Sequence, residues 1–445
     1  MPAGRQDACV PSCGRSLNLQ SPLSTLFSNR FVRLLLAAIG IVLCLLTIRA
    51  AGAFGISRLL VRFALARPNL AVAEKAVQLT PSEPQTHFAE AAVLSTLNRT
   101  AESAIEVERA VALRPADYFL WLQLGLLRDQ LGETSAAIAA FDEAVRLAPF
   151  YARPRWQRGN VLLRAGRYET AFTDLSQAAQ SNPELIPGLI NLAWNLSKAD
   201  ANLTEEWAQI KTNERRVAFA KFLAAHGRPK EAVAQFTALG TVPEDIRRQL
   251  VQQLIAKGAF AEAFEAWNFA RRLDSGAEES STRIDDGGFE AALTFDEIGF
   301  GWQVPRNLKG AAFSLNSIQP HGGSKNLRVD FGGDSNPNTD LVAQLVLVKP
   351  SQRYQINFAS RAEDVVTGGL PLVVVTDASD GKRLGQSATL GGKGTRNWQV
   401  SSFEFSTGLA TTAVIVSLQR ENCSTSPCPI FGSLSLDSFS VAQLK

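Results

Sequence analysis

The stretch Tyr118–Tyr151, YFLWLQLGLLRDQLGETSAAIAAFDEAVRLAPFY, decides the fold of the first part of the chain. Two small residues, Gly125 and Ala137, are spaced so that two helices can approach closely at these points. Three large apolar residues can fill the space between these helices and their neighbours: Trp121, Leu124 and Phe141. Pro149 cannot donate a backbone hydrogen bond into the preceding turn, so it marks a break before the next element. The stretch therefore predicts a helical hairpin.

The hairpin pattern recurs along the chain with a constant period of 34 residues. Four prolines share this phase: Pro81, Pro115, Pro149 and Pro183. An alanine stands five positions before each of them: Ala76, Ala110, Ala144 and Ala178. A phase that is held across four copies indicates a solenoid, in which each hairpin buries its apolar face against the next.

This spacing resembles the tetratricopeptide repeat, although Arg128 stands where that family carries its central tyrosine. The resemblance implies an all-α right-handed superhelix of six or seven helical hairpins over residues 56–273. It also implies that protein partners bind on the concave face, which the first helix of each repeat lines. The residues expected on that face, taken from phase alone, are His87, Glu90, Leu94, Gln123, Arg128, Arg158 and Leu162. The alternative is that each of them is an ordinary solvated position.

The helical pattern weakens after Pro183. A hairpin that begins near Leu189 is expected to be interrupted by the polar stretch Asp200–Thr204. Two later hairpins are expected at residues 216–239 and 247–273, because each has a glycine at its turn and apolar residues after it.

An apolar segment, Phe31–Ile48, precedes the repeats, and Arg33 near its start is its one charged residue. Its length and composition predict a transmembrane anchor over residues 31–50, with residues 1–30 as a disordered cytoplasmic tail. A cleaved signal peptide is the alternative, because Ala50–Ala53 could serve as a cleavage site. Arginines flank both ends of the segment almost equally, so charge alone does not orient it.

The sequence changes class near residue 283, after a polar linker at 274–283. From there to Lys445, short β-branched and aromatic runs alternate with clusters rich in Gly, Asn and Asp, which predicts an all-β sandwich over residues 284–445. The expected strands are 326–331, 341–348, 354–360, 370–376, 399–405, 413–419 and 434–441.

Six motifs in this region occur in a characteristic order: Asp286–Glu290, Gly301–Trp302, Gly322–Val329, Val348–Tyr354, Trp398 before a strand that contains Phe403, and Leu436–Phe439. Their order resembles the jelly-roll carbohydrate-binding modules of xylanases and related glycanases. The resemblance implies a structural calcium held by Glu290 and Asp437, with solvated strand-end charges as the alternative. The aromatic candidates for stacking on a glycan are Trp302, Tyr354 and Trp398, although each tryptophan is more often a core residue in this family.

Cys423 and Cys428 lie five residues apart in the loop before the last predicted strand. In an oxidising compartment they would form a disulfide worth roughly 2 kcal/mol; the alternative is two unpaired surface thiols. Together with the resemblance to a sugar module, the pair favours a cytoplasmic amino terminus and an exported, periplasmic remainder.

Composition and motifs argue against several other functions. The net charge of +3 is spread along the chain, so no basic surface for nucleic acid is expected. The chain has no phosphate-binding loop with its lysine, no nucleophile elbow and no paired-histidine metal helix. Gly391–Thr395 is expected to be a hairpin turn. We therefore expect no catalysis and no cofactor beyond the possible calcium.

Three hypotheses for the function remain. The first is a membrane-anchored scaffold that binds protein partners in envelope or exopolysaccharide assembly and export. The second is an extracytoplasmic glycan-binding protein that uses the sandwich. The third, and the one with least support, is a glycan-processing enzyme.

Overall fold

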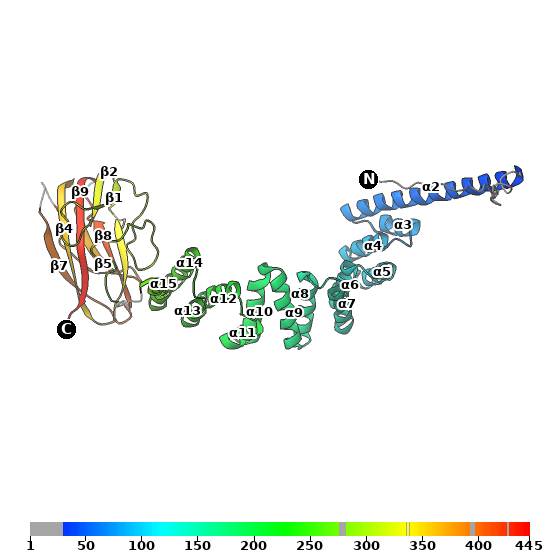
Figure 1. The fold of residues 1–445 in the computed structure, drawn as a ribbon, viewed down its shortest axis with the longest axis horizontal. Coiled ribbons are helices and arrows are strands. Elements are labelled where there is room, and N and C mark those ends of the chain that lie inside the picture. The colour runs from blue at the N-terminus through cyan, green and yellow to red at the C-terminus, as the bar shows by residue number, and fades with distance from the viewer. Residues whose placement is uncertain (1–29, 276–281, 335, 338, 392–396, 425–426) are drawn as a thin grey trace, which may run out of the picture. The chain divides into compact units, whose positions relative to one another are not determined.

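A computed structural model describes residues 30–275, 282–334, 336–337, 339–391, 397–424 and 427–445. Nearly all of the predicted tail, the middle of the predicted linker and most of the predicted turn at Gly391–Thr395 lie outside these residues. The chain forms two compact units, Met1–Ser181 and Asn182–Lys445. Figure 1 shows helices along the first part of the chain and strands at its carboxyl end.

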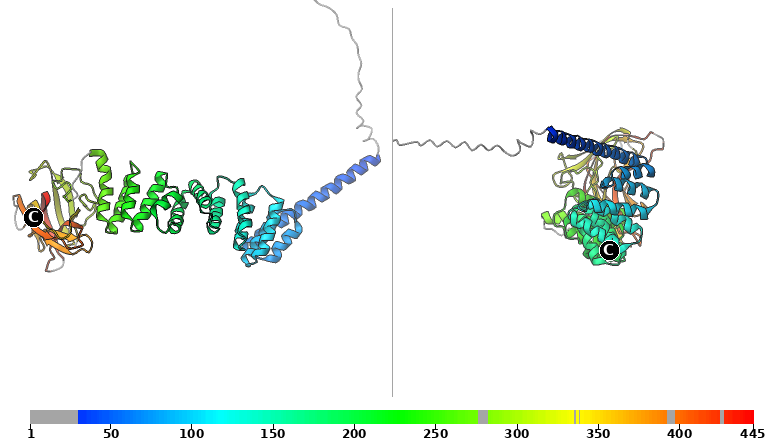
Figure 2. Two further views of the ribbon diagram at one scale, coloured as in Figure 1. Left: turned by 90° about the horizontal axis from the view of Figure 1, so that it is seen from below. Right: turned by 90° about the vertical axis from the view of Figure 1, so that its right-hand side faces the viewer.

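The first unit begins with one unbroken helix, α2 (Arg30–Ala66), whose first part is long and apolar enough to cross a membrane. Figure 2 shows α2 as one continuous helix that reaches the helices that follow it. Its last turns pack against α3 (Leu70–Leu79) and α4 (Pro84–Thr96). Val61 packs with Ala76 and Ala89, and the Oγ1 of Thr80 donates a hydrogen bond of 2.8 Å to the Oγ of Ser57.

The remaining helices of this unit follow the predicted 34-residue pattern. Helix α4 pairs with α5 (Thr100–Leu113), α6 (Tyr118–Gln130) with α7 (Thr134–Leu147), and α8 (Ala152–Arg164) with α9 (Tyr168–Ser181). Gly125 is needed for the α6–α7 pairing, because a Cβ there would lie 2.6 Å from the ring of Phe141. This part of the chain is therefore a TPR-like helical array, as its sequence predicts.

The second unit begins with seven helical segments: η1 (Pro183–Leu185), α10 (Ile186–Leu196), α11 (Ala201–Trp207), α12 (Asn213–Ala225), α13 (Pro229–Thr237), α14 (Glu244–Ala256) and α15 (Phe260–Ser275). The prediction that Asp200–Thr204 interrupts a hairpin is wrong. Asp200 begins α11 instead, because its carboxylate accepts a hydrogen bond of 3.0 Å from the backbone N–H of Leu203.

The strands form two antiparallel sheets. The five-stranded sheet has the order β1 (Ala311–Asn316), β2 (Asn326–Asp334), β9 (Pro429–Gln443), β4 (Arg353–Thr367) and β7 (Gln399–Ser406). The four-stranded sheet has the order β3 (Val342–Leu347), β8 (Ala413–Arg420), β5 (Pro371–Asp377) and β6 (Arg383–Gln386). Side chains from both sheets share one hydrophobic core. The all-β domain is thus confirmed, and the jelly-roll connection stays a prediction.

Within the second unit, helices α14 and α15 contact the loop that precedes the sheets. The indole Nε1 of Trp267 donates a hydrogen bond of 3.1 Å to the Oε1 of Glu297, and its ring lies 5.8 Å from that of Phe300. Arg248 donates a hydrogen bond of 2.7 Å to the carbonyl of Asp296. The tryptophan lies so close to Gly299 that a Cβ there would come within 2.5 Å of the indole.

Candidate functional site

The seven residues predicted to line a concave face lie on the first helices of the hairpins, and His87, Arg128 and Arg158 contact second helices. His87 is only 5% exposed, and its two ring nitrogens hydrogen-bond the Oε2 of Glu106 on α5 at 2.7 Å and the carbonyl of Pro81 at 2.9 Å. Leu94 is also buried, at 3% exposed. Burial of these two side chains leaves them no open surface for a partner.

Glu90 and Arg128 also face second helices. Burial, followed by the nearby charge of Glu106, raises the pKa of the Glu90 carboxyl. Arg128 forms ion pairs with Glu108 on α5 and with Glu133, and the hydrogen bond to Glu108 raises its pKa. Gln123 is half-buried on α6. Of the seven predicted residues, His87 and Leu94 are thus buried, and Glu90, Gln123 and Arg128 are half-buried.

The neighbours of the predicted residues make the contacts between one first helix and the next. Phe88, which follows His87, packs edge to face against Phe119 on α6, with 5.4 Å between ring centroids. Asp129, which follows Arg128, accepts a hydrogen bond of 2.6 Å from Arg164 on α8. A shift of one residue turns the side chain by about 100° around the helix, which explains the difference. In the sequence, the available signal was that Phe88 and Phe119 are both aromatic and lie on successive first helices.

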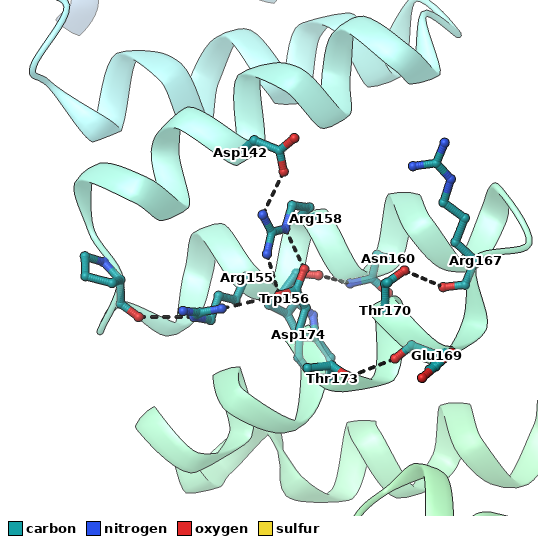
Figure 3. Close-up of polar contacts among 11 residues, drawn as sticks. Asp142, Arg155, Trp156, Arg158, Asn160, Arg167, Glu169, Thr170, Thr173 and Asp174 are labelled. Carbon is teal, nitrogen blue, oxygen red and sulfur yellow. Dashed lines mark hydrogen bonds and ion pairs between the residues drawn. The ribbon is translucent and has the colours of Figure 1, made fainter.

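Arg158 and Leu162 are the two predicted residues that lie at a pocket, together with side chains from α7 and α9. Arg158 donates two hydrogen bonds to Asp174 on α9, from Nε to Oδ2 at 2.6 Å and from Nη2 to Oδ1 at 2.7 Å. Its Nη1 donates to Asp142 on α7 at 2.7 Å. Figure 3 shows Arg158 between these two carboxylates, with Arg155 also directed to Asp174. The guanidinium therefore connects three helices.

The two carboxylates of this cluster differ in exposure. The Asp174 side chain is 5% exposed, whereas that of Asp142 is 54% exposed. Hydrogen bonding to Asp174 raises the pKa of Arg158 above its ordinary value. A bidentate arginine–carboxylate pair fixes the geometry of both groups. Arg158 is thus held rigidly at the pocket wall, with its charge balanced from two sides.

The pocket itself has a volume of ≈ 460 Å³ and combines apolar and polar lining. Ile138 and Leu162 supply its apolar surface. The exposed residues around it are Asp142, Arg167, Glu169, Thr170 and Thr173. In Figure 3 the guanidinium of Arg167 extends away from the Arg158 cluster. This arrangement can accept an apolar side chain while its rim hydrogen-bonds the polar atoms around that side chain.

The three predicted glycan-stacking aromatics have different environments. Trp302 stacks on Phe289 at 4.8 Å in the sheet core and donates a hydrogen bond of 3.0 Å to the carbonyl of Asp286. Tyr354 is fully buried, and its hydroxyl accepts a hydrogen bond of 2.8 Å from the backbone of Lys349. Neither ring has a face open to a sugar, so both belong to the core, which corrects their assignment as stacking candidates.

Trp398 is half-buried and remains the available candidate of the three. Its Nε1 donates a hydrogen bond of 2.8 Å to the carbonyl of Gln319. The guanidinium of Arg361 lies 5.2 Å from its ring centroid, and the ring of His321 lies 5.7 Å away. A role in sugar binding stays a prediction.

Glu290 and Asp437, the predicted calcium ligands, both accept hydrogen bonds from the segment 321–325. Glu290 accepts from the N–H and Oγ of Ser324 at 2.8 and 2.6 Å, and these bonds lower its pKa. Asp437 accepts from the N–H groups of His321 and Gly322 at 2.8 and 3.0 Å. Calcium requires six to eight oxygen ligands, and no group of three potential acidic, His or Cys ligands occurs in the described part of the chain. The two carboxylates are therefore placed to shape this loop, and calcium binding stays a prediction.

The predicted disulfide is present. Cys423 and Cys428 are bonded, and their Cα atoms are 5.5 Å apart. The bond closes the segment between β8 and β9, next to the buried Arg420, whose Nη2 donates a hydrogen bond of 2.9 Å to the carbonyl of Cys428.

Comparison with known proteins supports the repeat fold. Residues 120–151 match the Tetratricopeptide repeat family model. The chain is 32% identical over 91 residues to Protein FlbA of Caulobacter vibrioides, a match that covers 20% of this chain and 15% of that protein. The crystal structure of MamA is 17% identical with a TM-score of 0.28, covering 30% of this chain and 79% of that one. A CBM4 structure is 14% identical with a TM-score of 0.28, covering 36% and 99%. At such TM-scores neither structure carries an argument about function.

Proposed function

We propose that this protein is a membrane-anchored, non-enzymatic scaffold that uses its TPR-like helices to bind a protein partner. The observation that carries the proposal is the pocket on α7, α8 and α9, where a rigid arginine cluster borders an apolar surface; α7 lies within the matched residues 120–151, and α8 and α9 follow them. Rigid polar groups beside an apolar cavity suit a peptide side chain, because they fix its orientation without needing to reorganise. The match to the repeat family supports a partner that is a protein.

A photo-crosslinking residue at Thr173 tests this use of the pocket. We expect it to capture a discrete protein partner in cells, whereas the same residue at Ile105, which is 47% exposed on α5, should not capture that partner. Arg167→Glu reverses a charge at the rim and is expected to weaken partner binding about tenfold, by the loss of a polar interface contact. Equal capture from both positions, with no effect of the rim substitution, would refute the proposed site.

The finer proposal is that the scaffold works in the cell envelope, in the assembly or export of a component such as exopolysaccharide. It is supported by the combination, on one chain, of an apolar helix, a helical array and a disulfide-containing sheet domain. Disulfides persist in oxidising compartments, which favours a periplasmic position for the sheet domain. The anchor would then place the partner-binding helices beside the membrane.

A reporter fused after Lys445 tests this topology. We expect alkaline phosphatase at this position to be active and β-galactosidase to be inactive, because the first enzyme folds productively only outside the cytoplasm. The matched control carries the same reporters after Arg30, on the other side of the apolar helix, where the pattern should be reversed. Activity of the cytoplasmic reporter alone at Lys445 would contradict the periplasmic placement.

A further inference from the structure

The last turns of α2 carry an exposed surface that the scaffold function does not use. Arg58, Leu59, Arg62 and Phe63 form this juxtamembrane surface, and Leu59 and Phe63 are 66% and 49% exposed. The buried residues of the same turns lie at other angles around the helix and pack on α3 and α4: Ser57, Val61 and Ala64. The apolar side chains of the surface are therefore not needed for the first hairpin.

The charge around this surface is uniformly positive. No aspartate or glutamate occurs between Arg30 and Ala73, and the first acidic residue after the apolar segment is Glu74. Four arginines follow that segment within α2 and just after it: Arg49, Arg58, Arg62 and Arg67. Among the described residues, the structure gives these four side chains no ion-pair partner. Such uncompensated charge beside an apolar segment is complementary to an anionic surface.

The unbroken helix sets the distance from this surface to a membrane. A span needs about 20 residues to cross the hydrocarbon core, so counting from the residue after Arg33 places its other edge near Ala53. At about 1.5 Å per residue, Leu59 lies roughly 9 Å and Phe63 roughly 15 Å beyond that edge. The head-group region extends about 5–7 Å beyond the core on each side. Arg58 and Leu59 therefore lie just beyond its outer boundary, and Arg62 and Phe63 lie one turn further out. All four side chains lean back toward the membrane, because helical side chains point toward the amino-terminal end of their helix.

We propose that the juxtamembrane surface binds acidic phospholipid head groups. Arg58 and Arg62 pair with lipid phosphates, while Leu59 and Phe63 insert beside them at the interface. Each arginine is expected to strengthen the contact with an acidic bilayer about fivefold. A second copy of this chain is the other conceivable occupant of the apolar side chains, but pairing two such surfaces would bring their arginines together. The inference rests on the proposed membrane anchor and adds the class of lipid that positions the first hairpin.

The experiment uses the full chain in lipid nanodiscs, with Cys9, Cys13 and Cys44 replaced by alanine and the disulfide intact. A bimane label at Ala66→Cys, an exposed position one turn from the surface, reports contact with spin-labelled lipid head groups. We expect strong quenching in discs that contain phosphatidylglycerol, several-fold weaker quenching in phosphatidylcholine alone, and the same loss in the double variant Arg58→Glu with Arg62→Glu. A label at Ile105→Cys serves as the control for non-specific quenching.

A label at Leu43→Cys, inside the apolar segment, separates this inference from the anchor. If lipids that carry a deep quencher do not quench it, the proposed anchor fails. If they do quench it while the Ala66→Cys label behaves like the control, only the lipid contact fails. The proposal is also overturned if quenching of the Ala66→Cys label is the same in acidic and neutral lipid and is unchanged in the double glutamate variant. Dipolar coupling between spin labels at Ala66→Cys of two copies would overturn it as well, if the coupling does not depend on lipid composition, because the surface would then pair with a second copy of the chain.

Discussion

Replacement of Asp174 by alanine is expected to destabilise helices α8 and α9 by about 3 kcal/mol, because it removes one partner from a buried ion pair. Its carboxylate accepts both hydrogen bonds of the bidentate contact with Arg158 and a further one from Arg155 at 3.4 Å. Without it, Arg155 and Arg158 lose their shared carboxylate, and the exposed Asp142 is the acidic partner that Arg158 keeps. Hydrogen exchange of the full chain should show amides of α9 opening roughly 100-fold more often, since each 1.4 kcal/mol is a factor of ten.

The matched control for this prediction is Asp142→Ala. The Asp142 side chain is 54% exposed and makes one contact with the same arginine, at 2.7 Å. A solvent-exposed pair contributes less than about 1 kcal/mol, so the change in α9 exchange should stay below roughly fivefold. Equal effects of the two substitutions would mean that burial does not determine the strength of this cluster. The proposed binding pocket would then lack the rigid Arg158 side that we expect to orient a peptide side chain.

Replacement of Trp267 by alanine is expected to cost about 3–5 kcal/mol in the unit 182–445, as for other large buried side chains. Trp267 is only 2% exposed and fills the space between Phe300 and Gly299. The substitution leaves a cavity and removes the donor that binds Glu297. Thermal unfolding of the full chain should show a lower midpoint for this unit, and hydrogen exchange should show faster opening of the segment 296–303.

Trp267→Phe is the control that keeps an aromatic ring at this position. It removes the indole N–H and part of the ring, so we expect it to cost about 1–2 kcal/mol. Glu297→Gln keeps an acceptor for the indole N–H, so we expect it to change the free energy of unfolding very little. If Trp267→Ala left both the midpoint and the exchange of 296–303 unchanged, the contact between α15 and this loop would not contribute to stability.

Much of the fold could be predicted from local pattern. The spacing of Gly125, Phe141 and Pro149 placed α6 and α7 correctly, because these residues report which helix faces approach a neighbour. Strands β1 and β6 were missed. β1 contains two alanines and no β-branched residue, and β6 has only four residues, one of them a glycine. The polar residues near Asp200 concealed a short helix because they serve as its cap.

The candidate site was less predictable than the fold. Phase identified Arg158 and Leu162 but could not show that they meet Asp142 and Asp174, which lie on two other helices. The same reasoning assigned His87 to an open face, where the structure buries it against Glu106. An error of one position rotates a side chain by about 100°, so a face chosen by counting alone is easily the wrong one.

By itself, the sequence determined the helical period, the apolar segment capable of spanning a membrane, the change from helices to strands and the cysteine pair. These features depend on contacts between residues that are close in sequence, or on whether a residue prefers water or an apolar environment. Local composition and spacing report both. Only the tertiary structure decided the Arg158 pocket, the Trp267 contact and the core positions of Trp302 and Tyr354. Each of these joins residues from separate elements, 16 positions apart for Arg158 and Asp174 and 30 for Trp267 and Glu297. Their partners depend on how helices and strands pack, which no single stretch of the chain encodes.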